Sequence, residues 1–188
     1  MTVPRSPGVA PTGEIGLACH LRETARLAVP VMLSRAGLVL MLTVDTSIVG
    51  HLTFAGLQLA ALGAALVAQT VLQTAAVGLL IGVIVRTAQL DGGGKSAECG
   101  QIWRLGVLLA VLIGGLYALL LAPGTTILGA WLGQPVEVAE AGGPVLRALG
   151  LGMPGLLVFI ACAHFLEGIN RPIPPMLLML VANLLNAG

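Results

Sequence analysis

The sequence is poor in charged and aromatic side chains. Of its 188 residues only 9% are Asp, Glu, Lys or Arg and 3% are aromatic, and the formal net charge is +1. A soluble domain carries about 25% charged residues. Binding to nucleic acid requires a basic surface, and single strands also require stacking aromatics. The sequence therefore excludes a nucleic-acid-binding protein and argues against an ordinary soluble one.

Cysteine pairs and a secretory signal are also missing. Cys19, Cys99 and Cys162 are scattered and form neither a CxxC pair nor a zinc-binding spacing. We expect them to be small apolar fillers, with no disulfide, no metal bound by cysteine and no cofactor. Residues 1–26 lack a short apolar core before a small-residue cleavage site, so we do not expect them to act as a signal peptide. This tail is rich in Pro and Gly, and we expect it to be disordered and cytoplasmic.

Two patterns resemble enzyme motifs, but both are incomplete. The run "DGGGKS" at 91–96 would need a glycine at position 89 to be a phosphate-binding loop, and that residue is Gln89. Ser47 and His51 are four residues apart, but no motif around them supplies an oxyanion hole. We therefore expect no catalytic residues and no enzyme.

Long apolar runs dominate the rest of the chain. Hydrophobic residues make up 57% of it, 26 residues are glycine, and the mean hydropathy is +1.00. A membrane-crossing helix needs about 20 mostly apolar residues. This composition predicts an all-α polytopic membrane protein packed through small side chains. The predicted helices span residues 27–49, 57–85, 105–122, 145–169 and a truncated 175–188, with an interfacial half-turn at 128–135.

Basic residues set the predicted orientation. The connections at 50–56 and 123–144 contain no Lys or Arg. Basic residues occur instead in the tail, in the connection between 85 and 105, and in the turn at 171. By the positive-inside rule the N-terminus is cytoplasmic. The last run of about 14 residues would rise only about 21 Å in a bilayer core of about 30 Å. We therefore expect the chain to be a fragment.

Asp45 is the most unusual residue of the first predicted helix. It lies about 27 Å along the axis from Leu27, nearer the outer than the inner membrane surface. An ionisable group at such a depth is costly and is a default candidate for function. The interpretation favoured here is that Asp45 binds a proton, Na⁺ or a cationic substrate group. The alternative is a carboxylate reaching the outer interface. The stem of Arg35 can reach the inner interface, and His51 is expected in a solvated loop.

Other polar side chains on the helices are weaker candidates. Four polar residues of the second predicted helix, two glutamines and two threonines at positions 69–74, form a stripe along it. The stripe either lines a cavity or makes interhelical hydrogen bonds, and the sequence does not decide between these two roles. His164, Glu167 and Arg171 are expected to be a structural cluster at the inner interface rather than a gate. The weak cavity-lining candidates are Gln69, Thr70, Gln73, Thr74, Thr43 and Asn183.

Two segments carry a resemblance to a known family. "LAVPVMLSRAGLVLMLTVDTSIVGHL" (Leu27–Leu52) resembles the first helix of multidrug and toxic compound extrusion (MATE) transporters, with its early proline and VDT–small–GHL ending. "FLEGINRPIPPMLLMLVANLLN" (Phe165–Asn186) is similar to the family's junction between the fourth and fifth helices. The order and separation of the two motifs make the combination fairly specific.

The resemblance implies a fold and a function. Such transporters have twelve helices in two six-helix lobes, so this chain would supply four helices and part of a fifth from the N-terminal lobe. They sit in the bacterial inner membrane and export organic cations and other amphipathic drugs in exchange for Na⁺ or H⁺. Asp45 matches the family's acidic residue proposed to take the coupling ion, and Asn186 matches the asparagine beside it. The partners would be the lipid bilayer, such drugs and the missing C-terminal lobe.

Two alternatives remain open. The chain could be a truncated membrane fragment that transports nothing. It could also belong to a lipid-precursor flippase of related architecture, which would be expected to line its cavity with several basic residues. Only Arg35 and Arg147 are candidates for that role.

Overall fold

A computed structural model describes residues 17–51 and 54–187, and these residues form helices joined by short turns. Four helices are long and apolar enough to cross a membrane, and α6 is a shorter apolar helix. Within the described residues no strand occurs, in agreement with the all-α prediction. The elements are α1 (Leu17–Gly50), α2 (Ala55–Gly92), α3 (Ser96–Leu120), α4 (Gly124–Thr126), the π-helical turn η1 (Ile127–Trp131), α5 (Val136–Gly168) and α6 (Ile173–Ala187).

The helices are separated by residues that leave the helical backbone conformation. Phe54 and Asn170 have φ angles of 62° and 57°, and they lie just before α2 and just after α5. Gly94, with φ of 73°, makes the turn between α2 and α3, where the Ser96 hydroxyl donates to Asp91 Oδ1 at 2.9 Å. The glycine-rich run that resembled a phosphate loop is thus a helix–helix turn.

Several predicted boundaries were wrong. The predicted disordered tail lies outside the described residues up to 16, but from Leu17 the chain is helical. α5 begins at Val136 rather than 145, and α3 begins at Ser96 rather than 105. Glu137, assigned to a loop, lies in the first turn of α5, where an acidic side chain is favourable beside the positive end of the helix dipole. Hydropathy marks the membrane-embedded part of a helix, and these helices continue beyond it.

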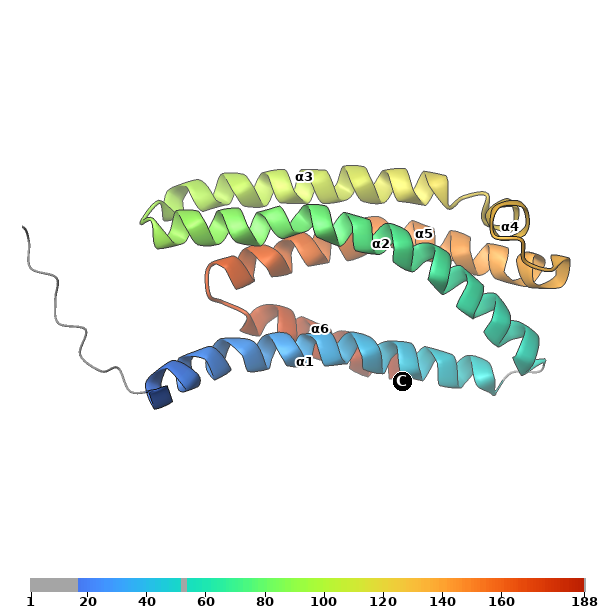
Figure 1. The fold of residues 1–188 in the computed structure, drawn as a ribbon, viewed down its shortest axis with the longest axis horizontal. Coiled ribbons are helices and arrows are strands. Elements are labelled where there is room, and N and C mark those ends of the chain that lie inside the picture. Colours follow the sequence, from blue (N-terminus) through green and yellow to red (C-terminus); the bar gives the residue numbers. More distant parts are fainter. Residues whose placement is uncertain (1–16, 52–53, 188) are drawn as a thin grey trace, which may run out of the picture.

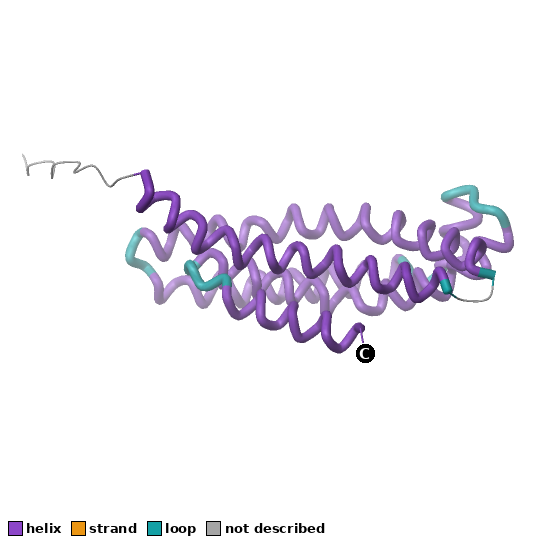
Figure 2. The backbone as a smooth tube through the Cα atoms, turned by 90° about the horizontal axis from the view of Figure 1, so that it is seen from below, coloured by secondary structure: helices purple, strands orange, loops and turns teal. Residues whose placement is uncertain are grey.

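Two groups of helices form the bundle. α5 packs mainly against α2 and α3, whereas α1 packs mainly against α6 and only weakly against α2. Figure 1 shows the α1–α6 pair below the other long helices, and Figure 2 shows the same pair side by side from below. The turn after α2 and the turn after α5 lie at one end of the bundle, and α4 lies at the other. We call these the α2–α3 end and the α4 end.

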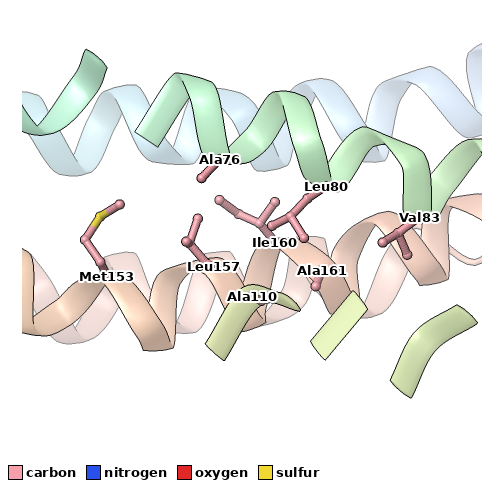
Figure 3. Packing of buried hydrophobic residues seen from close by; sticks show 8 residues of the cluster. All are labelled: Ala76, Leu80, Val83, Ala110, Met153, Leu157, Ile160 and Ala161. Atoms are coloured by element: carbon pink, nitrogen blue, oxygen red, sulfur yellow. The ribbon is translucent and has the colours of Figure 1, made fainter. Parts of the chain in front are cut away.

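The core lies between α2, α3 and α5. Figure 3 shows how small and branched apolar side chains from the three helices meet there. Within this core the backbones of α3 and α5 approach closely, since a Cβ on Gly114 would lie 2.5 Å from Pro154 Cα. Glycine therefore allows these two helices to touch. The residues drawn are Ala76, Leu80, Val83, Ala110, Met153, Leu157, Ile160 and Ala161.

Candidate ion site

Asp45 and Asn186 are in direct contact although 141 residues separate them in the chain. Asn186 Nδ2 on α6 donates to Asp45 Oδ1 on α1 at 2.9 Å, and both side chains are half-buried. The carboxylate therefore has a polar neighbour on a different helix.

The approach of α1 to α6 is made possible by a small residue two turns before Asp45. A Cβ on Gly37 would lie 3.0 Å from both Asn183 Nδ2 and Met179 Cγ. Asn183 in turn donates from Nδ2 to the Met179 carbonyl at 2.9 Å. A side chain at position 37 would therefore have to displace the side chains of Asn183 and Met179 on α6.

One oxygen of this pair is unusual. Asn186 Oδ1 is buried and has no hydrogen-bond partner among the described residues. A buried carbonyl oxygen without a partner is costly, and it favours a donor or a cation beside it. Together with the carboxylate of Asp45 it offers two hard oxygen ligands, which suit Na⁺ or a shared proton. The described residues contain no cluster of three or more His, Cys, Asp or Glu side chains that could hold a metal ion.

The other predicted polar residues do not share one cavity. Gln69 is buried, and its Nε2 lies 3.7 Å from Met153 Sδ on α5. Gln73 lines a cavity between the two helix groups, whereas Thr70 and Thr74 are exposed along a different, open groove. The two glutamines therefore face inward and the two threonines face outward.

Thr43 and Asn183 line the same groove between α1 and α6. Its volume is about 510 Å³, and its lining is mostly apolar. Thr43 Oγ1 donates to the Val39 carbonyl at 2.9 Å, so its proton is used within α1. Neither Asp45 nor Asn186 lines this groove, although Asn183 lies three residues before Asn186 on the same face of α6.

A second polar region brings together residues that the sequence analysis had placed apart. Arg35, His164 and Glu167, together with Gln73, line one cavity of about 60 Å³ between the α1–α6 pair and α2–α5. His164 is only 3% exposed, and its Nδ1 lies 3.1 Å from the Leu80 carbonyl oxygen. His164 is therefore buried between the helices, and its place in a cluster at the inner interface stays a prediction. The i,i+3 spacing placed it beside Glu167, but nothing in the sequence placed α1 opposite them.

His51 lies at the end of α1 and is exposed. Its Nδ1 is 2.7 Å from the Ser47 carbonyl oxygen, one turn earlier. It accordingly closes the last turn of the helix, as expected for a residue where α1 ends.

The fold and the site define a polytopic α-helical membrane protein with an embedded carboxylate–amide pair. Residues 30–188 match the model of the MatE family. The chain belongs to this family.

Curated relatives carry names from multidrug resistance. The chain is similar to "Probable multidrug resistance protein NorM" of Caulobacter vibrioides, with 38% identity over 89% of this chain and 35% of the relative. It is 34% identical to the protein of the same name in Bradyrhizobium diazoefficiens, over 91% of this chain and 36% of the relative. "Multidrug resistance protein MdtK" of Pectobacterium atrosepticum is 27% identical over 88% of this chain and 36% of its own length. The chain thus spans little more than a third of these relatives, and no solved structure matches it.

Proposed function

We propose that this chain is the N-terminal part of a secondary active multidrug exporter, a transporter and not an enzyme. It would exchange organic cations and other amphipathic drugs for Na⁺ or H⁺ in the bacterial inner membrane. Membership of the MatE family and the names of the relatives support this proposal. Arg86, Lys95, Arg104 and Arg171 lie toward the α2–α3 end, which supports a cytoplasmic location for that end and for the N-terminus.

The coupling ion would bind between Asp45 and Asn186. The single observation that carries this assignment is the buried, unpartnered Asn186 Oδ1 beside a carboxylate that already accepts from Nδ2 of the same amide. Na⁺ would be bound by the carboxylate and this amide oxygen. A proton on Asp45 would allow the side-chain amide of Asn186 to rotate by about 180°, so that the Asp45 carboxyl group donates to Asn186 Oδ1. Either ion satisfies the oxygen that otherwise has no partner.

Ion binding would change how α1 and α6 pack. An ionised carboxylate inside a membrane needs polar neighbours, and neutralising it removes that requirement. The α1–α6 pair packs only weakly against the rest of the bundle, so a change at Asp45 can bias its position relative to α2 and α5. The cavity between the two groups would then differ between the ion-bound and ion-free states. The remaining part of the transporter would supply the surface opposite this lobe.

Transport by the protein expressed from its full gene tests the proposal. Asp45→Asn keeps the size of the side chain but removes the charge, so efflux of a cationic dye driven by a Na⁺ or H⁺ gradient should fall at least tenfold. Glu140→Gln is the matched control, because Glu140 is an exposed acidic residue near the start of α5. Comparing the two gradients identifies the coupling ion. Unchanged gradient-driven efflux in Asp45→Asn would overturn the assignment.

A further inference from the structure

Arg147 is a basic residue on the half of the bundle where Lys and Arg are otherwise absent among the described residues. Four basic residues lie toward the α2–α3 end, namely Arg86, Lys95, Arg104 and Arg171. Arg35 lines the cavity that it shares with His164 and Glu167, called the inner cavity below. Arg147 instead lies on α5 next to α4. A charged residue in a membrane helix implies a partner.

A hollow lies beside this arginine, and three polar side chains line it among mostly small apolar residues. It has a volume of about 450 Å³ and is lined by Arg147 together with Thr125 and Thr126 of α4. Arg147 and both threonines are exposed. Among the described residues, no acidic side chain lies within ion-pair distance of the Arg147 guanidinium, and Glu137 and Glu140 do not line the hollow.

Backbone packing holds the threonines beside α5. Gly124 and Gly143 approach so closely that a Cβ on Gly124 would overlap the Gly143 carbonyl oxygen. A Cβ on Gly143 would likewise overlap Thr125 Oγ1. The two glycines therefore bring α4, and Thr125 in particular, close to the helix that carries Arg147.

The position of the hollow matches the level of lipid headgroups. α5 has 33 residues and would rise about 50 Å, well beyond a bilayer core of about 30 Å. Arg147 is 11 residues from its start, about 17 Å along the axis, so its long side chain can reach the interface. Trp131, 80% exposed, lies at the same end, as tryptophans at a membrane interface do.

We propose that this hollow binds the phosphate group of an anionic phospholipid of the phosphatidylglycerol type. The planar guanidinium of Arg147 can donate two parallel hydrogen bonds to phosphate oxygens, and the threonine hydroxyls can donate to the remaining ones. Leu151, one turn further along α5, is 67% exposed and also lines the hollow, where it would contact an acyl chain. A headgroup without an ammonium group is favoured because Arg147 would repel that group. This site does not depend on the proposed transport function.

Tryptophan quenching by brominated lipids tests the proposal locally, because the two tryptophans lie at opposite ends of the bundle. The substitution Trp103→Phe leaves Trp131 as the one tryptophan of the chain. The Trp103→Phe protein serves as the parent for the other variants and is placed in two sets of phosphatidylcholine vesicles. One set contains brominated phosphatidylglycerol and the other contains the same fraction of brominated phosphatidylcholine. Trp131 should report a preference of about tenfold for the anionic lipid, equivalent to about 1.4 kcal/mol.

Variants then locate the site. Arg147→Gln should abolish the preference, Arg147→Lys should retain part of it, and Arg104→Gln, at the other end, should leave it unchanged. If Arg147→Gln loses helix content by circular dichroism, the double variant Thr125→Val and Thr126→Val takes its place and should weaken the preference. Equal quenching by both lipids in the parent, or a preference that persists in the variants, would overturn the proposal. So would loss of the preference on adding inorganic phosphate, because the ligand would then be free phosphate.

Discussion

The contact between Gly114 and Pro154 leads to a quantitative prediction about packing. A Cβ on Gly114 would lie 2.5 Å from Pro154 Cα and 2.8 Å from Pro154 N, both backbone atoms. Carbon atoms pack best at about 3.5–4.0 Å, so Gly114→Ala must move α3 and α5 apart by about 1 Å. Overpacking of this kind costs about 1–3 kcal/mol, of which the better helix propensity of Ala recovers about 0.5–1 kcal/mol. We expect a net destabilisation of about 0.5–2 kcal/mol.

The neighbouring glycine is the matched control. A Cβ on Gly115 would meet no atom within 4 Å, so Gly115→Ala should stabilise the fold by about 0.5–1 kcal/mol through helix propensity. The free energy of unfolding can be compared for both variants by circular dichroism during titration with sodium dodecyl sulfate. Opposite signs for the two substitutions are expected. Equal effects would refute the account of how α3 and α5 pack.

Two further predictions concern the inner cavity and the α1–α6 contact. His164→Ala removes a buried hydrogen bond to the Leu80 carbonyl and should lower the free energy of unfolding by about 1–3 kcal/mol, whereas His51→Ala should change it by less than about 0.5 kcal/mol. A similar loss for both histidines in thermal unfolding would contradict the burial of His164. Gly37→Leu should separate α1 from α6 and reduce gradient-driven efflux at least tenfold. Gly63→Leu should leave efflux unchanged, because a Cβ on Gly63 would meet no atom within 4 Å. Normal efflux in Gly37→Leu would refute the role of this contact.

The helices and one polar pair were predictable from the sequence for different reasons. A run of about 20 apolar residues is a strong signal, so the four long helices and the shorter last one were all expected. The adjacency of Asp45 and Asn186 came from the resemblance to MATE transporters, and the hydrogen bond between them agrees with it. Hydropathy alone cannot pair residues 141 positions apart.

The remaining features depend on information that hydropathy does not carry. A helix that is apolar on every side has no marked face, so the sequence could not say that Gln69 and Gln73 point inward while Thr70 points outward. The start of α5 at Val136 lies in a stretch whose charge and glycine content suggested a loop. The cavity shared by Arg35 and Glu167 requires α1 and α5 to face each other across it, which only the three-dimensional arrangement supplies.

The ion site itself is tested most directly by infrared difference spectroscopy of the purified protein. The spectrum is recorded with and without Na⁺ and across a range of pH, so that the carboxyl and carboxylate bands report proton or Na⁺ binding. We predict a difference band that is lost in Asp45→Asn, altered in Asn186→Leu and retained in Glu140→Gln. A spectrum that is unchanged in Asp45→Asn would contradict the assignment of Asp45 and Asn186 as the ion site.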